Sequence, residues 1–194
     1  MGRPSLAGER TEQILDAFER CVARFGLEGS SLDRIAEEAD MKRSILRHYI
    51  GNRDELVLAL ADRVIAKYEA HFESHLQATS AFTPVKQLMG YLFPAKAVSS
   101  TESILVIESL IAAGATCPDI RKKMMGYIDR LIERSASLLR RAYPEKSSQK
   151  CWAAAYGVVS ICFNQESLTP LGPPPKYLRA AKSSAEVLIT SLER

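Results

Sequence analysis

The sequence has too few cysteines, too widely spaced, for a disulfide framework or a structural metal site. The four thiols are far apart, each lies within an apolar helical pattern, and no CxxC or CxxH pair occurs. They are Cys21, Cys117, Cys151 and Cys162. Free, buried thiols in a reducing compartment are therefore expected.

Long apolar runs are also absent. The longest, about residues 151–163, is shorter than the roughly 20 residues that a membrane-spanning helix needs. The N-terminal segment MGRPSLAGER has no apolar core of the kind that secretory signals carry. We expect a soluble, cytoplasmic protein that has no membrane partner.

Sheet-forming patterns are missing as well, since no stretch of five or more alternating β-branched residues occurs. Apolar residues instead repeat every three or four positions along nearly the whole chain. Prolines and glycines separate the segments, most clearly at Pro118, Pro144 and residues 172–175. These patterns predict an all-α fold of about nine helices, over approximately residues 14–25, 32–39, 42–50, 52–77, 84–94, 102–115, 118–142, 146–167 and 175–193.

Enzyme motifs are lacking too. The chain has no glycine-rich phosphate loop, no GxSxG and no paired Glu-x-x-His. His71 and His75 are four residues apart, a spacing that can hold a divalent metal, but Glu73 lies on another face and no third ligand is visible. We predict no enzymatic activity, no cofactor and no metal site.

Charge of one sign is scarce, because the net charge is only +3 over 194 residues. Residues 1–56 hold nine Lys/Arg against eleven Asp/Glu, a net charge of −2. Within them, residues 41–53 contain no acid and gather the cationic or titratable side chains of Lys42, Arg43, Arg47, His48 and Arg53. Such a run is commonly a solvated helix face, so its meaning depends on its structural context.

That context is a pair of short predicted helices joined by a tight turn, which is typical of a helix-turn-helix. Ala36 falls where the two helices touch, and Asp40 falls in the turn, where the backbone is often left-handed. The side chains expected to pack inward against Phe18 and Val22 are those of Ile35, Ala39, Ile45 and Leu46.

The basic side of the second short helix then faces outward and fits the major groove of DNA. Lys42 or Arg43 would donate to guanine O6 and N7, while Ser44 and His48 would contact bases or phosphates. The predicted phosphate contacts are Ser31, Arg47, Tyr49 and Arg53. A minor-groove arm at residues 2–4 is the less favoured interpretation, because this segment holds a single arginine.

The segment SLDRIAEEADMKRSILRHYIGNRDEL resembles the signature of the TetR family of bacterial transcriptional regulators. The residues that match the signature are Ile35, Ala36, Ala39, Leu46, Ile50, Arg53, Glu55 and Leu56. Asp40, Arg47 and Tyr49 depart from it, where the family usually has Gly, Tyr and His. The resemblance implies a homodimer that binds a pseudo-palindromic DNA operator, most often as a repressor, and that a small-molecule effector releases.

We predict a helix-turn-helix DNA-binding domain over residues 1–51 and a helical effector-binding and dimerisation domain over residues 52–194. In the last predicted helix, apolar and small residues repeat at spacings of three and four. The residues of this seam that we assign to the dimer interface are Leu178, Ala181, Ala185 and Leu188. The alternative is that the seam packs only within the monomer.

Glu108 is the one acid in the apolar segment ILVIESLIAAG, where burying a carboxylate would be costly. If it faces a cavity, a cationic or hydrogen-bond-donating effector is favoured. The residues predicted to line this effector cavity are Met89, Phe93, Ile107, Glu108, Ile111, Met124, Tyr127, Trp152 and Tyr156. Plain core packing is the alternative for each of them.

Two other functions stay open. One is a helix-turn-helix DNA-binding protein without an effector, whose C-terminal domain binds a protein partner. The other is a helical ligand carrier that does not bind DNA. Reversing the charge of Arg43 and Arg47 separates a carrier from a DNA-binding protein, whose duplex affinity is salt-sensitive. A cavity in the C-terminal domain argues against the first alternative.

Overall fold

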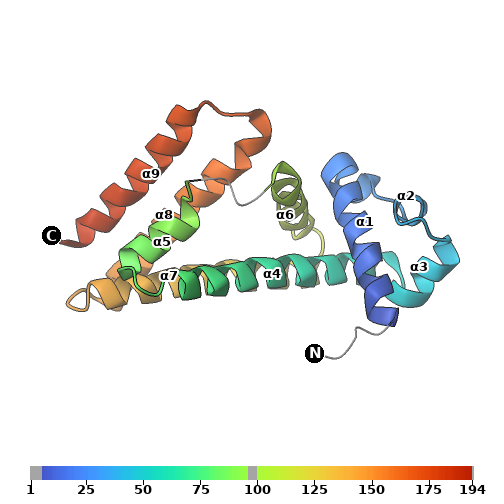
Figure 1. Ribbon diagram of the computed structural model, residues 1–194, viewed down its shortest axis with the longest axis horizontal. Helices are drawn as coiled ribbons and strands as arrows, with labels where there is room; N and C mark the ends of the chain where they lie inside the picture. Colours follow the sequence, from blue (N-terminus) through green and yellow to red (C-terminus); the bar gives the residue numbers. More distant parts are fainter. Residues whose placement is uncertain (1–5, 96–99, 194) are drawn as a thin grey trace. The chain divides into compact units, whose positions relative to one another are not determined.

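The computed structural model describes residues 6–95 and 100–193, and these residues form α-helices and two short 3-10 turns but no strand (Figure 1). The α-helices are α1 (Leu6–Gly29), α2 (Leu32–Glu38), α3 (Arg43–Ile50), α4 (Arg53–Ala78), α5 (Pro84–Leu92), α6 (Thr101–Ala113), α7 (Pro118–Ala142), α8 (Ser148–Ser167) and α9 (Pro175–Thr190). The 3-10 turns are η1 (Thr169–Leu171) and η2 (Ser191–Glu193). The predicted all-α class is confirmed. The predicted helix ends agree to within a few residues, except that α1 starts earlier, at Leu6.

The chain divides into two compact units. One comprises Met1–Lys67 and Ser99–Met124, and the other comprises Tyr68–Val98 and Met125–Arg194. Helices α4 and α7 each contribute residues to both. These units are defined by packing, whereas the predicted domains, which meet between residues 51 and 52, are defined by function. The predicted domain boundary therefore stays a prediction. The segment considered as a minor-groove arm, residues 2–4, lies outside the described residues.

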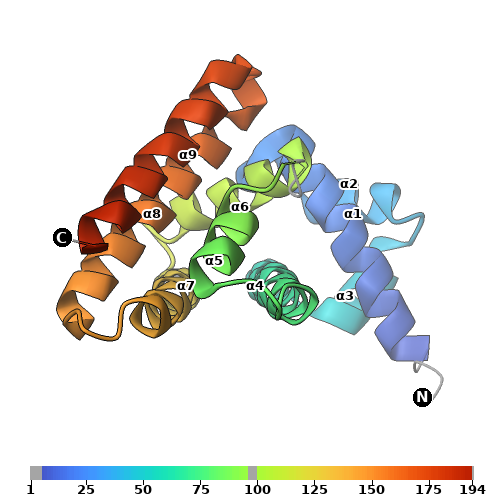
Figure 2. The same ribbon diagram turned by 60° about the vertical axis from the view of Figure 1, so that its left-hand side comes forward.

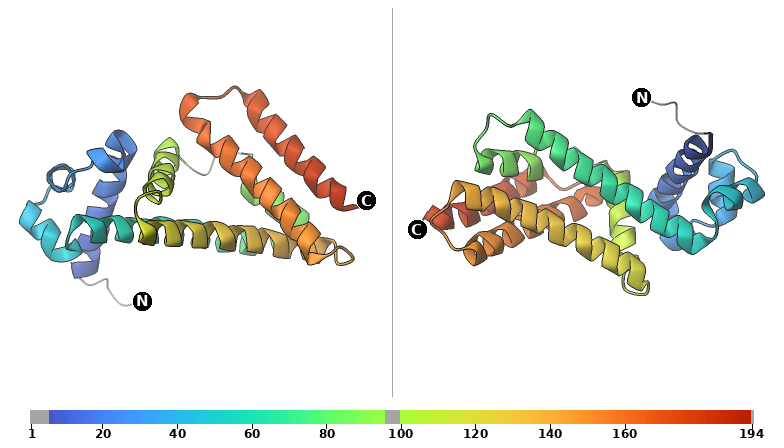
Figure 3. Two further views of the ribbon diagram at one scale, coloured as in Figure 1. Left: turned by 180° about the vertical axis from the view of Figure 1, so that it is seen from behind. Right: turned by 90° about the horizontal axis from the view of Figure 1, so that it is seen from below.

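The core of the first unit is built on α1, which packs against α2, α3 and α6 (Figures 1 and 3). Its apolar stripe points inward, because Ile14, Phe18 and Val22 are fully or almost fully buried. The stripe is interrupted at Gly26, where φ is 68° and the backbone leaves the helical conformation. Glycine adopts that φ without strain, so the helix predicted over residues 14–25 is kinked just after its expected end and continues for one more turn to Gly29.

Four ion pairs in this unit connect α1 to the first half of α4. Arg63 contacts Glu12, Asp16 and Glu19, and Lys67 Nζ lies 2.7 Å from Glu19 Oε2. Only 10% of the Arg63 side chain is exposed, so its partners compensate a charge that is largely removed from water. These acids on α1 explain why the N-terminal part of the chain is acidic outside α3.

In the second unit, α8 and α9 form a hairpin whose helices lie side by side (Figures 1 and 2). A side chain at Gly157 of α8 would place its Cβ 2.9 Å from Leu188 Cδ1, so the glycine permits a close approach of the two helices. Ala185 and Ile189 of α9 are buried at this contact. The seam of small and apolar residues in the last helix is therefore used at least in part within one chain.

Two ion pairs in the second unit join α4 to α7. Glu69 Oε1 lies 2.7 Å from Arg130 Nε, and Glu73 Oε1 lies 3.2 Å from Arg134 Nη1. Both pairs join residues that are 61 positions apart in the sequence. A constant separation of this kind means that the two helices run in the same direction here.

Two further predictions concern cysteines and membranes. All four cysteines are free, as predicted, and Cys21, Cys151 and Cys162 are buried, whereas Cys117 is half-buried. None of the described helices is long and apolar enough to span a membrane.

Candidate nucleic-acid interface and effector pocket

The helix-turn-helix is formed by α2, a tight turn and α3. Ser31 caps α2, because its hydroxyl oxygen accepts a hydrogen bond from the Arg34 main-chain nitrogen at 3.2 Å. In the turn, Asp40 has a φ of 51°, and the Met41 nitrogen donates to the Ala36 oxygen at 2.9 Å. The left-handed turn predicted at Asp40 is confirmed, as is the burial of Ala36.

Helix α3 directs one side chain inward and most of the others outward. Leu46 is fully buried, and Ile35 and Ala39 of the preceding segment are buried as predicted. The prediction for Ile45 was wrong, because 41% of this residue is exposed. Neighbouring residues of a helix point about 100° apart, so Ile45 and Leu46 do not share a face, and Leu46 is the one that is buried.

The exposed surface of α3 is cationic with one apolar side chain. Its exposed residues are Lys42, Arg43, Ser44, Ile45, Arg47 and His48. Tyr49 is half-buried, and its ring meets the His48 ring edge-on, with 5.2 Å between ring centroids. Every predicted DNA contact on α3 except Tyr49 therefore lies fully at the surface, and their contacts with DNA stay predictions.

Arg53, a predicted phosphate contact, forms hydrogen bonds within the chain. Its Nη1 donates to the Ser30 oxygen at 2.5 Å, and its Nη2 donates to the Leu27 oxygen. The side chain is half-buried and satisfies carbonyls left open where α1 ends. Both terminal nitrogens are thus bonded within the chain, and the contact of Arg53 with a phosphate stays a prediction.

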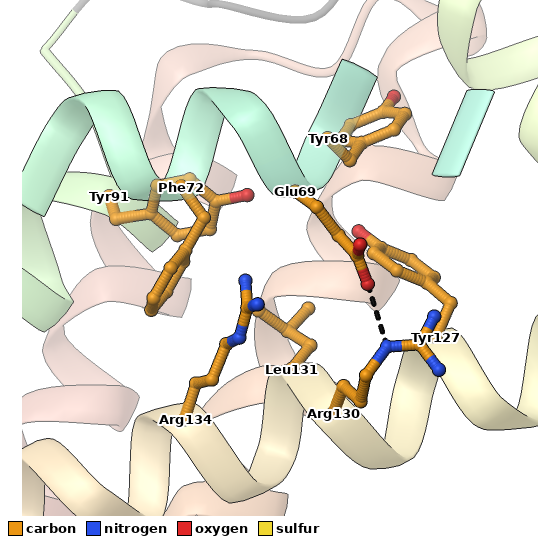
Figure 4. A pocket seen from close by; sticks show the side chains of 8 residues that line it. All are labelled: Tyr68, Glu69, Phe72, Tyr91, Tyr127, Arg130, Leu131 and Arg134. Carbon is orange, nitrogen blue, oxygen red and sulfur yellow. Dashed lines mark hydrogen bonds and ion pairs between the residues drawn. The ribbon is translucent and has the colours of Figure 1, made fainter. Parts of the chain in front are cut away.

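A small pocket lies in the second unit between α4, α5 and α7 (Figure 4). It is narrow and partly open to solvent, so that its empty space of about 200 Å³ includes solvent outside the protein. Its lining residues are Tyr68, Glu69, Phe72, Tyr91, Tyr127, Arg130, Leu131 and Arg134. Four of these eight carry aromatic rings and three carry charges, so the pocket combines apolar surface with a few polar groups, as ligand sites do.

The rings of the pocket pack on one another. Phe72 and Tyr91 meet edge-on with 4.7 Å between centroids, and Tyr68 and Tyr127 lie 6.0 Å apart. Burial raises the pKa of the Tyr91 and Tyr127 phenols far above their usual range. Both hydroxyls therefore stay protonated at physiological pH and keep their capacity to donate hydrogen bonds.

The charged groups of the pocket come from α4 and α7. Figure 4 shows the Glu69 carboxylate joined to Arg130 beside the pocket. The Arg134 guanidinium lies over the Phe72 ring, 5.5 Å from its centroid. Two guanidinium groups and one carboxylate thus line the pocket, and Glu108 does not.

Of the nine residues predicted for the effector cavity, the structure brings only Tyr127 to this pocket. Met89 and Phe93 are buried in the same unit but do not line it. Trp152 and Tyr156 are 43% and 53% exposed and stack on each other along α8, with centroids 5.7 Å apart, so their predicted place in an enclosed cavity was wrong.

The remaining cavity candidates belong to the first unit. Ile107 and Met124 are buried there, Glu108 is half-buried, and Ile111 is 41% exposed. Apolar periodicity identifies buried faces, but it does not distinguish packed residues from pocket-lining ones. Tyr68 and Phe72, which line the pocket, were not predicted, although their apolar spacing of four residues within the helix predicted over residues 52–77 was an available signal.

The predicted dimer residues on α9 differ in accessibility. Leu178 is 40% exposed, Ala181 and Leu188 are half-buried, and Ala185 is fully buried within its own chain. Ala185 therefore cannot meet a partner, which corrects that assignment. The large apolar side chains that α8 and α9 expose are Trp152, Tyr156, Tyr177, Leu178 and Val187.

The histidine pair on α4 is engaged with protein groups. His75 Nε2 lies 2.9 Å from the Gln87 oxygen, and the His71 ring lies 5.6 Å from that of Tyr91. Among residues 6–95 and 100–193, no three potential metal ligands come together.

The N-terminal part of the chain matches a known family. Residues 14–60 match the model of the bacterial regulatory proteins, tetR family. A helix-turn-helix transcriptional regulator of Haemophilus influenzae is 35% identical over 71 residues, which is 37% of this chain and 38% of that protein. The sequence match thus spans well under half the length of this curated relative.

Solved structures resemble nearly the whole chain. A TetR transcription regulator from Haloarcula marismortui has a TM-score of 0.79 at 13% identity, with 94% of this chain and 97% of that chain covered. A transcriptional regulator from Saccharomonospora viridis, solved in complex with choline, has a TM-score of 0.79 at 14% identity, with 94% and 96% covered. At such identities the likeness establishes the fold. The motif over residues 14–60 is thus similar to that of the bacterial regulatory proteins of the tetR family, the chain has the fold of the solved regulators, and the matched proteins named above are all transcriptional regulators.

Proposed function

We propose that this protein is a DNA-binding transcriptional regulator. The observation that carries the proposal is the exposed cationic surface of α3, where Lys42, Arg43 and Arg47 face solvent in a part of the chain that is otherwise acidic. A helix with such a surface fits the major groove, and phosphates on either side attract its cations.

The individual contacts follow from the positions of the side chains. Arg43 and Lys42, at the start of α3, donate to guanine O6 and N7. Arg47 and the hydroxyl of Ser31 donate to phosphates. Ile45, which sequence reasoning had placed in the core, offers its exposed aliphatic side chain to a thymine methyl group.

The regulator acts as a homodimer on a pseudo-palindromic operator. The exposed apolar side chains on α8 and α9, Trp152 and Tyr156 among them, support this assembly because soluble monomers seldom leave such a group uncovered. Two copies present two α3 helices to half-sites about 34–36 Å apart along DNA.

A small-molecule effector binds in the pocket of Figure 4 and releases the operator, so that the protein represses transcription. The aromatic lining and the protonated phenols of Tyr91 and Tyr127 support a ligand site. Helix α4 begins three residues after α3 ends and supplies Glu69 and Phe72 to the pocket. A change at the pocket therefore reaches the helix-turn-helix through one continuous helix. The coupling free energy between effector binding and DNA binding is typically about 1–3 kcal/mol.

The second candidate function is that of a DNA-binding protein whose C-terminal domain binds no effector. The pocket is small, because even its empty space of about 200 Å³ includes open solvent, and this favours such a protein over a ligand carrier. Screening small molecules for a rise in melting temperature separates the regulator that has an effector from the one that has none. A ligand that binds only the folded state raises the melting temperature. A regulator of bacterial genes works in the cytoplasm, which is our proposed location.

The test of DNA binding uses charge reversal. Arg43→Glu/Arg47→Glu should abolish salt-sensitive binding to duplex DNA, whereas Lys86→Glu/Lys122→Glu, which changes two exposed lysines on α5 and α7, should leave it intact. Equal binding by both variants and the unchanged protein would overturn the proposal.

A further inference from the structure

An ion pair joins α2 to α3 on the surface that we propose meets DNA. A single nitrogen of Arg43, Nη1, donates to both carboxylate oxygens of Asp33, at 3.0 Å to Oδ1 and 2.8 Å to Oδ2. Arg43 is the first residue of α3, and Asp33 lies in the first turn of α2. The pair thus connects the N-terminal ends of the two helices.

This pair contributes little to folding. The Arg43 side chain is 51% exposed and that of Asp33 is 69% exposed, and water screens ion pairs that are this open. For DNA binding, a carboxylate at this place is by itself unfavourable, because it brings negative charge toward the phosphates. Its presence there is explained if it acts through the arginine.

The geometry of the guanidinium supplies that action. Arginine carries five N–H donors in one plane, and Asp33 occupies Nη1 alone. The Nε and Nη2 donors lie together on the other edge of the plane, and no hydrogen bond from either is recorded within the described part of the chain. Two parallel donors of this kind match the O6 and N7 acceptors of guanine.

We propose that Asp33 is a positioning residue that sets the base specificity of Arg43, an inference that rests on the proposed DNA-binding function. Asp33 holds Nη1 and turns the Nε–Nη2 edge of Arg43 toward the groove. There the two donors bind the O6 and N7 atoms of guanine in preference to the other bases. Without Asp33, the long arginine side chain reaches phosphates and other base acceptors, and the preference at that base pair relaxes.

The experiment uses the full-length protein and a library of random-sequence DNA duplexes with fixed ends. Sites enriched by the unchanged protein define the preferred base at each position. Affinities of Asp33→Asn are then measured for the enriched duplex and for duplexes changed at single guanines. Glu37→Gln is the matched control, since Glu37 is an exposed acid on the same helix and has no recorded contact with Arg43.

We expect Asp33→Asn to lose preference for guanine at one position of each half-site by about tenfold, while the preferences elsewhere persist. Glu37→Gln should keep every preference. In an Arg43→Lys background, where the planar donors are gone, Asp33→Asn should change nothing further at that position.

Two results would overturn the inference. In the first, Asp33→Asn strengthens binding to all duplexes by one factor and leaves the preferences unaltered, so that Asp33 only repels DNA. In the second, Asp33→Asn alters the preference equally in the Arg43→Lys background, so that it does not act through Arg43. Failure of the proposed function is distinguishable, because the unchanged protein would then enrich no sequence and bind no duplex at low salt.

Discussion

Arg53 Nη1 donates a hydrogen bond of 2.5 Å to the main-chain oxygen of Ser30, and this bond ties the first residue of α4 to the segment that follows α1. The same guanidinium also reaches the Leu27 oxygen. One side chain therefore ties the start of the long helix to the helix-turn-helix, and we expect its substitution to affect folding.

Arg53→Ala should lower the free energy of unfolding by about 1–3 kcal/mol, because it leaves two main-chain oxygens without their charged donor. Urea unfolding measures the change. Arg47→Ala is the matched control: its side chain is exposed, so the free energy of unfolding should stay nearly constant while duplex affinity falls and depends less steeply on salt. Normal stability of Arg53→Ala together with lost DNA binding would mean that Arg53 acts as a phosphate contact and not in folding.

Asp40 holds the turn in a left-handed conformation that costs most residues about 1–2 kcal/mol, and glycine much less. Asp40→Gly should therefore keep or raise stability, whereas Asp40→Val should lower it, because a β-branched residue is strained at positive φ. Thermal unfolding of the two variants at one pH checks this order. A lower melting temperature for Asp40→Gly would mean that the aspartate side chain itself stabilises the turn.

The buried phenols of Tyr91 and Tyr127 predict a loss of stability in alkali. Their pKa values are raised above the ordinary value of 10.0, so the folded state holds protons that the unfolded chain releases. Their contribution is complete below pH 10 and is lost as the pH rises above it. Unfolding in urea between pH 9 and 11 measures the fall, which Tyr91→Phe/Tyr127→Phe should reduce.

Tyr177→Phe is the control for this pair of substitutions, because Tyr177 is 46% exposed. It should leave the alkaline loss as it is in the unchanged protein. The same loss in the double variant would assign the effect to other groups.

The exposed stack of Trp152 on Tyr156 is expected to lie in the dimer interface. Trp152→Glu/Tyr156→Glu should convert the dimer to a monomer, because four carboxylates would have to be buried in a symmetric contact. Light scattering reports the mass. Phe82→Glu places a similar charge on another exposed aromatic residue, outside α8 and α9, and should leave the dimer intact.

Much of the fold was predictable because its signals are local. Pro118 and Pro175 start helices, and Gly26 interrupts one, since each restricts or frees the backbone at its own position. Asp40 is similar, because the turn between two short helices needs a left-handed residue. The choice between Ile45 and Leu46 was not local: it depends on which side of α3 meets α1.

The pocket was not predictable for the same reason. Glu69 and Arg130 look like ordinary charges on the outer faces of two helices, and their contact joins positions 61 residues apart. No periodicity within either helix indicates that pairing. Glu108 was predicted to line the cavity because it is the one acid of an apolar segment. The acid that lines the pocket is Glu69, which lies in a segment where charged residues are common.

The two acid–base pairs that join α4 to α7 in the second unit limit how a ligand can move these helices. Sliding α4 by one turn would bring Glu69 level with Arg134 and leave Arg130 and Glu73 without their counter-charges. Translation of α4 along its axis therefore breaks both ion pairs. Rotation of α4 about its axis preserves them, because the flexible side chains can follow. We expect a ligand that enters beside Phe72 to rotate α4 about its own axis and not to shift it along that axis.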